Sequence, residues 1–135
     1  MGSRTPSTAI LETWVQKPDA WGVAADTSSA LDVSHCDYVT FHIHVGTLGS
    51  SGTVDLKVQS CATSGGSYAD ISGAAITQIT TADTSARIEV RLSGHHDFVK
   101  TVMTVGTAAS DVAVLAVQHV FDTSALPSAV SWVSV

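Results

Sequence analysis

Histidine is the residue type with the most chemical potential in this chain, and two of its six histidines form a His-x-His pair. Successive residues of a strand rise about 3.3 Å, so His42 and His44 lie on one face about 7 Å apart. Two imidazoles at this spacing bind a metal when a neighbouring strand supplies further ligands. In the strand pairing expected below, His44 faces Asp55 and His42 faces Lys57. Because the lysine repels a cation, we predict a polar face with a cross-strand His–Asp pair and no metal.

The other candidate groups give no catalytic arrangement. His95 and His96 are adjacent and followed by Asp97, but neighbouring side chains in an extended turn point apart and do not chelate one ion. Ser50 and Ser51 lie in GSSG, which lacks the G-x-S-x-G spacing of a nucleophile elbow. The carboxylates are scattered, with no pair placed as acid and base. We therefore expect a protein that is not an enzyme and that carries no cofactor.

The three tryptophans, Trp14, Trp21 and Trp132, lie toward the two ends of the chain. Exposed aromatic rings serve as sugar platforms in carbohydrate-binding β-sandwiches, and they also anchor one protein surface on another. We favour the anchoring role because these residues do not share one strand face. The C-terminal segment adds an uncharged apolar group that we expect to dock on a partner. The predicted interface residues are Trp14, Trp21, Leu126, Val130, Trp132, Val133 and Val135.

Composition narrows the class of protein. The 135 residues fit one domain; 44% are hydrophobic and 13% charged, with many small and β-branched residues that suit pleated sheets. The formal charge is −6 without a Lys/Arg cluster, so we expect no nucleic-acid partner. No apolar run approaches the roughly 20 residues that span a bilayer, so we expect no membrane partner. The N-terminal residues lack the apolar core of a secretory signal, so we expect a soluble protein that is made in the cytoplasm and is not exported through a cleaved leader.

The residues from 38 to 61 show the strongest structural pattern. Apolar and polar residues alternate over 39–45 and again over 54–58, on either side of a loop that reads GTLGSSG. Alternation with a period of two predicts half-buried antiparallel strands, and the glycine-rich loop suits a tight reversal. We therefore predict a β-hairpin in which Val45 faces Val54. This pairing brings Cys36 near Cys61 on the polar face, where either a disulfide or two separate thiols are possible.

Further strands follow along the chain. We expect a short one around residues 75–79, one at 85–92 with Ile88, Val90 and Leu92 facing inward, and one at 97–105. The run from 112 to 121 is apolar on both faces, which indicates a strand covered on both sides, either centrally in the sandwich or at a subunit contact. The fold class is all-β: a single antiparallel β-sandwich, jelly-roll-like, with extended terminal arms. We place the N-terminal arm at 1–29, the sandwich at 30–121 and the C-terminal arm at 122–135.

The order of these motifs resembles a family of small virion proteins of tailed bacteriophages, encoded among the head genes. The similarity covers about residues 30–120. Its motifs are YVTFHIHVGTLGSSGTVDLKVQSC at 38–61, SYADISGAA at 67–75, EVRLSG at 89–94 followed by Phe98, and VGTAASDV at 105–112. The chain departs from the family at 94–97, where relatives commonly carry basic residues and this sequence has His95 and His96.

The resemblance implies a capsid decoration or cement protein that stabilises an icosahedral head by bridging capsomers. Its partners would be the major capsid protein and further copies of itself, for example as a trimer, on the capsid surface of the virion. The same features leave open another virion position, such as a vertex protein, head-fibre base or tail protein, and a carbohydrate-binding β-sandwich module.

Overall fold

The computed structural model describes residues 9–92 and 97–120. These residues form nine β-strands and no helix. The strands are β1 (Ala9–Trp21), β2 (Ala24–Thr27), β3 (Leu31–Asp32), β4 (Cys36–Leu48), β5 (Thr53–Cys61), β6 (Ala69–Ala75), β7 (Thr84–Arg91), β8 (Phe98–Gly106) and β9 (Ser110–Val120). No helix in this part of the chain is long and apolar enough to cross a bilayer.

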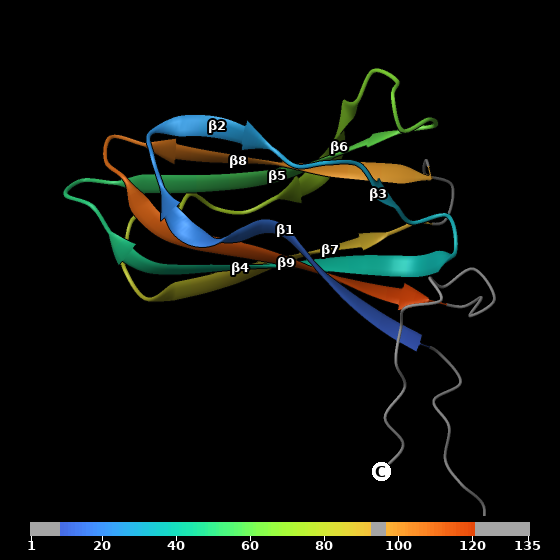
Figure 1. The fold of residues 1–135 in the computed structure, drawn as a ribbon, viewed down its shortest axis with the longest axis horizontal. Coiled ribbons are helices and arrows are strands. Elements are labelled where there is room, and N and C mark those ends of the chain that lie inside the picture. The colour runs from blue at the N-terminus through green and yellow to red at the C-terminus, as the bar shows by residue number, and fades with distance from the viewer. Residues whose placement is uncertain (1–8, 93–96, 121–135) are drawn as a thin grey trace, which may run out of the picture.

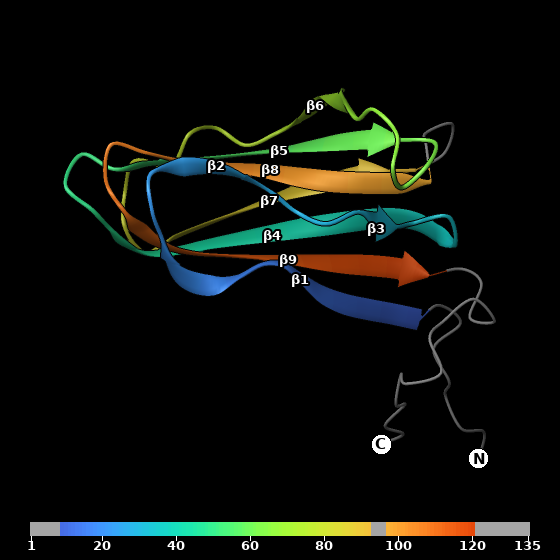
Figure 2. The same ribbon diagram turned by 45° about the horizontal axis from the view of Figure 1, so that its top comes forward.

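The strands form two antiparallel sheets that face each other (Figure 1). Sheet A has the order β1-β9-β4-β7, and sheet B has the order β2-β8-β5-β6, with β3 paired to β8. The view in Figure 2 shows the two sheets as separate layers. The predicted fold class, an all-β antiparallel sandwich, is confirmed.

The core lies between the sheets and is built by alternation along each strand. On β4, Val39, Phe41 and Ile43 are fully buried, whereas the residues between them point outward or sit under neighbouring side chains. The inward positions predicted on β7 are confirmed, since Ile88 and Val90 are buried. Aliphatic side chains of both sheets interdigitate here, and burying each one stabilises the fold by roughly 1.5 to 3 kcal/mol.

The predicted hairpin is wrong, although both of its strands exist. β4 belongs to sheet A, where it pairs with β7 and β9, and β5 belongs to sheet B, where it pairs with β6 and β8. Val45 pairs with Val112, and Val54 pairs with Val105. The loop between β4 and β5 therefore carries the chain from one sheet to the other. Both apolar faces point into the same core from opposite sides, which gives the same alternation as a hairpin.

The cysteines also differ from expectation. Cys36 and Cys61 are both free and buried, not placed on a polar face. The Cys36 thiol donates a hydrogen bond of 3.2 Å to Oε1 of Gln118. Because the two cysteines begin β4 and end β5 in different sheets, the pairing that would have brought them together does not form.

The sandwich begins earlier in the chain than predicted. Residues 9–27 fall within the predicted N-terminal arm at 1–29, yet β1 is a full strand of sheet A and β2 is a strand of sheet B. The boundary predicted at residue 30 therefore lies inside the fold. The C-terminal arm at 122–135 and the turn histidines His95 and His96 lie outside the described residues.

Candidate functional site: the outer face of sheet A

The side of sheet A that points away from the core carries a group of apolar and aromatic side chains, here called the apolar stripe. Its members come from β1, β9 and β4, and they are Ile10, Trp14, Tyr38, Leu115 and Val117. The strand register places them in adjacent rows: Ile10 pairs with His119, Trp14 pairs with Leu115, and Tyr38 pairs with His119. Single exposed apolar residues are ordinary, but a contiguous group on one sheet face marks an interaction surface.

Trp14 is the largest exposed member of the apolar stripe, with 48% of its surface accessible. Ile10, two rows away on the same strand, is 54% exposed. The pairing of β1 with β9 shifts in register just after Trp14, so that Gln16 turns inward and is buried. Such a bulge redirects side chains along a strand. The regular part of β1 therefore presents its outward side chains on the same face of sheet A as the outward residues of β9 and β4.

Tyr38 and His119 form the aromatic end of the apolar stripe. Their rings stack with centroids 3.9 Å apart and an angle of 18° between the planes. The His119 side chain thus packs against an aromatic ring on the adjacent strand. Stacking removes rotational freedom from both side chains, so this end of the face is ordered before any partner binds.

His42 and His44 lie side by side on this outer face, with ring centroids 6.4 Å apart. The neighbours predicted for them are wrong, because β4 does not pair with β5. His42 is flanked in the sheet by Leu115 and Arg87, and Nδ1 of His44 lies 2.9 Å from Oγ of Ser85. Within residues 9–92 and 97–120, no group of three or more His, Cys, Asp and Glu side chains is arranged to hold a metal ion.

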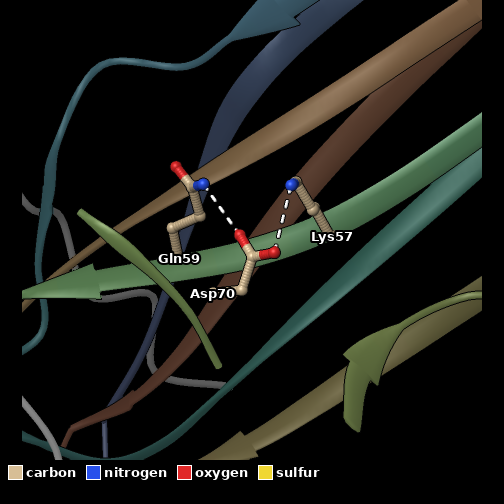
Figure 3. Close-up of polar contacts among 3 residues, drawn as sticks. All are labelled: Lys57, Gln59 and Asp70. Atoms are coloured by element: carbon tan, nitrogen blue, oxygen red, sulfur yellow. Dashed lines mark hydrogen bonds and ion pairs between the residues drawn. The ribbon is translucent and has the colours of Figure 1, made fainter. Parts of the chain in front are cut away.

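The outer face of sheet B is chemically different, because polar side chains bond to one another across it. Asp70 on β6 receives two contacts from β5: Lys57 Nζ lies 3.1 Å from Oδ2, and Gln59 Nε2 donates to Oδ1 at 2.8 Å (Figure 3). The hydrogen bond from Gln59, followed by that from Lys57, lowers the pKa of the Asp70 carboxyl. Nearby, Lys100 Nζ lies 4.4 Å from the centre of the Tyr68 ring. These polar and charged groups therefore bond to one another on this face.

The predicted interface residues divide into three groups. Trp14 is on the exposed outer face, as an interface anchor would be. Trp21 instead packs against the core, and its indole Nε1 donates to the carbonyl oxygens of Lys17 at 3.0 Å and Val112 at 3.1 Å. The remaining five residues, Leu126, Val130, Trp132, Val133 and Val135, lie outside the described part of the chain.

Sequence reasoning did not single out Leu115, Val117 and Tyr38. A signal for the first two was present, because residues 112–120 are apolar on both faces. The structure explains that pattern: β9 lies between β1 and β4, its inward residues are buried in the core, and Leu115 and Val117 are half-buried on the outside. Tyr38 gave no such signal because an aromatic residue at the start of a strand is common in any sheet.

No protein-family model matches the chain, and no curated protein matches it. Among solved structures, the chain is similar to one from Bacillus endospore appendages, described as a novel family of disulfide-linked pili. The two are 22% identical, the match covers 85% of this chain and 91% of the other, and the TM-score is 0.46. At this level the likeness assigns no function.

Proposed function

We propose that this chain is a structural protein of a bacteriophage virion, a decoration or cement protein that stabilises the icosahedral head by bridging neighbouring capsomers. The observation that carries the proposal is the contrast between the two outer faces. Sheet A presents the apolar stripe with Trp14 exposed, and sheet B presents polar groups that bond to one another. A β-sandwich with exposed apolar side chains on one outer face is suited to packing against other proteins. The assignment to a phage head rests on the sequence motifs between residues 38 and 112.

The proposed mechanism is mechanical. A maturing capsid expands and its shell becomes thinner, so a protein that spans the seams between capsomers opposes the internal pressure by adding buried contact area. A standard protein interface buries about 1,600 Å², and many copies act together on one particle. Trp14 is the best-placed anchor within the described residues, because tryptophan is enriched where interfaces concentrate their binding energy.

The test uses purified heads that lack this protein. The full chain should co-sediment with them, in amounts comparable with the major capsid protein. A connector or tail-tip protein would bind in far fewer copies, and that stoichiometry would favour the other virion positions. No binding to heads at saturating concentration would overturn the proposal.

A glycan-binding module is the second candidate, because the exposed indole of Trp14 lies on a flat sheet face, where a sugar ring can stack on it. The variant Trp14→Ala separates the two when it is assayed against heads and against a panel of immobilised glycans. Val23→Ala is the matched control, since Val23 is 58% exposed and does not belong to the apolar stripe. Loss of head binding supports the virion role, and loss of glycan binding alone supports the module.

A further inference from the structure

The two sheets of the sandwich have four edges, and three of them are poorly suited to accept a further strand. On sheet A, the β1 edge is interrupted by two register shifts and by Pro18, which has no backbone N–H to donate. On sheet B, one edge consists of β2 and β3, which have only four and two residues. The other edge is β6, whose pairing with β5 is shifted and which contains Gly73 with a positive φ. Short, bulged or proline-containing edges resist strand addition.

The fourth edge, β7, is regular and open. Its eight residues include neither proline nor glycine, and among the described strands they pair with β4 alone, without a register shift. Just beyond β7, the N–H of Leu92 donates to the carbonyl oxygen of Asp37 at 3.0 Å, which sets the phase of the ladder with β4. Because backbone groups alternate in direction along a strand, those of Arg87, Glu89 and Arg91 point away from β4, toward the free edge.

A hollow lies beside this edge, between β7 and the chain that follows β6. It has a volume of about 470 Å³ and is lined by residues 75–81 together with the first half of β7. A second hollow, toward the end of β7, is lined by Ile71 and Val90 among others. Ile71, Ile76 and Ala86 pack against the core here and are only half-buried. Apolar side chains of an added strand would cover them.

The residues that follow β9 supply a segment of matching length and composition. Residues 128–135 read SAVSWVSV, which is as many residues as β7 has, and they include three valines and one tryptophan without a charged side chain. β-Branched and aromatic residues favour strands. Alternate positions form two sets, one with Val130 and Trp132 and the other with Val133 and Val135. Such a segment suits a strand with apolar contacts on both faces.

The chain is long enough to bring this segment to β7. Val120 at the end of β9 pairs with Cys36, at the same end of sheet A as Arg91 at the end of β7. A strand beyond β7 would lie three strand spacings from β9, about 14 Å away, and the linking residues 121–127 span about 23 Å when extended. Running back from there, the segment would be antiparallel to β7. Beside β1 it would run parallel, which is the less stable pairing.

We propose that residues 128–135 add to the free edge of β7 in the same molecule, as an antiparallel fifth strand of sheet A. Val130 and Trp132 then face the hollows, which have room for the large indole ring. Val133 and Val135 extend the outer face of sheet A. Addition within one molecule is favoured over addition to a second copy, because the short linker holds the segment at a high effective concentration.

The inference deepens the proposed function, and it rests on that function for the role of the enlarged face. The added strand would widen the surface that packs against the capsid beyond the apolar stripe. Removal of the segment, or loss of the Trp132 ring that holds it, would then reduce this surface.

The experiment is amide hydrogen exchange, followed by NMR in the full chain and in a chain truncated after residue 125, without heads. Truncation should speed the exchange of the Arg87, Glu89 and Arg91 N–H groups by about ten-fold or more, because they lose their partners. The N–H groups of Ile88 and Val90 point toward β4 and are the internal control, which should change little. Equal rates in the two chains at the first three positions would overturn the inference.

Two proline substitutions in the full chain test the phase of the added strand. In the proposed arrangement the N–H of Ser131 points to β7 and that of Ser134 points away. Ser131→Pro should therefore expose the β7 amides to exchange, and Ser134→Pro should leave them protected. The reverse pattern would overturn the placement of Trp132 over the hollow.

The dependence of exchange on protein concentration distinguishes the two sources of the strand. Protection of β7 should be the same in dilute and concentrated samples. Protection that appears only as the concentration rises would assign the strand to a second copy and overturn addition within one molecule. The proposed function fails separately: protected β7 amides in a chain that does not bind heads overturn only the virion role, and head binding with unprotected amides overturns only this inference.

Discussion

Thr101 on β8 donates a hydrogen bond of 2.8 Å to Oε1 of Gln16 on β1, and this contact joins the two sheets inside the sandwich. Both residues are almost completely buried. The amide nitrogen of Gln16 also lies 3.2 Å from Oδ2 of Asp26 on β2, and the Thr101 backbone N–H donates to Oγ of Ser28. A polar network in a low-dielectric interior is favourable only when each member has a partner.

We predict that Gln16→Ala destabilises the fold by about 1–3 kcal/mol, because it leaves the Thr101 hydroxyl buried without its acceptor. Urea denaturation measures the change. Thr101→Val should cost a similar amount, and the double variant should cost less than the sum, since both changes remove the same bond. Thr77→Ala, at an exposed position, is the control. Additive effects of the two substitutions would contradict a direct interaction between the two side chains.

The Cys36 thiol is expected to be unreactive in the folded protein. Burial, and after it the negative charges of Asp32 and Asp37, raise the pKa of Cys36 to about 12. The thiolate is the form that reacts with iodoacetamide, and at pH 8 little of the Cys36 thiol is deprotonated in the folded protein. Iodoacetamide should therefore label Cys36 slowly in the native state and quickly in urea. Mass spectrometry of the labelled peptides measures both rates. Equal rates in the two states would show that the thiol is accessible.

The raised pKa of Cys36 also predicts that the folded protein loses stability at alkaline pH. The folded protein holds the Cys36 proton above the pH at which the unfolded chain releases it, near the ordinary value of 9.0. The stability contributed by the protonated Cys36 thiol is therefore fully present below about pH 9, and it decreases as the pH rises toward 12. Cys36→Ala should lose less stability than the unmodified chain over this range in urea titrations.

Asp70 gives the opposite dependence, at acid pH. The hydrogen bonds from Gln59 and Lys57 lower the pKa of its carboxyl, so the charged form is favoured in the folded state. The stability contributed by the charged Asp70 carboxyl is present above pH 3.8, the ordinary pKa of an aspartate. It is lost as the pH falls through the lower pKa of this carboxyl in the folded state. Asp70→Asn should melt below the unmodified chain at pH 7, and the difference should shrink below about pH 4. A titration of the Asp70 carboxyl by NMR that shows no lowering would contradict the contact in Figure 3.

Alternation along a strand predicts which side chains are buried. On β7 it correctly predicted that Ile88 and Val90 face the core. It does not identify the partner of a strand. Val45 and Val54 point into one core whether their strands pair in a hairpin or face each other from two sheets. The choice between these folds depends on β4 pairing with β7 and β9, contacts distant in sequence that no local pattern encodes.

The candidate site was predictable only in part, for the same reason. Trp14 is singled out by its residue type, and the doubly apolar run of β9 indicates an outward face that includes Leu115. Their meeting on one surface depends on the pairing of β1 with β9, which joins the beginning and end of the described chain. For Trp21, residue type alone did not predict the role of the side chain. Its indole N–H donates to the carbonyl oxygen of Val112 in the same sheet, so this tryptophan holds β1 on β9 within the sandwich.

We predict that His42 and His44 bind no structural zinc. Arg87 flanks His42 in the sheet, and a guanidinium repels a cation at that position. Elemental analysis of protein purified without a histidine tag provides the measurement. Stoichiometric zinc that disappears in His42→Ala would contradict the prediction and support a metalloprotein.

The C-terminal segment offers the last prediction, because its removal tests which part of the chain attaches to a head. Residues 126–135 carry five large apolar side chains without a charged side chain, and the core residues of the described part of the chain all lie at or before Val120. We expect a chain truncated after residue 125 to be soluble and to melt cooperatively, because it keeps every core residue of residues 9–92 and 97–120. It should no longer co-sediment with heads. Trp132→Ala in the full chain should weaken head binding in the same direction. If the truncated protein bound heads as tightly as the full chain, attachment would lie elsewhere, and the exposed part of β1 around Trp14 would be the first surface to test.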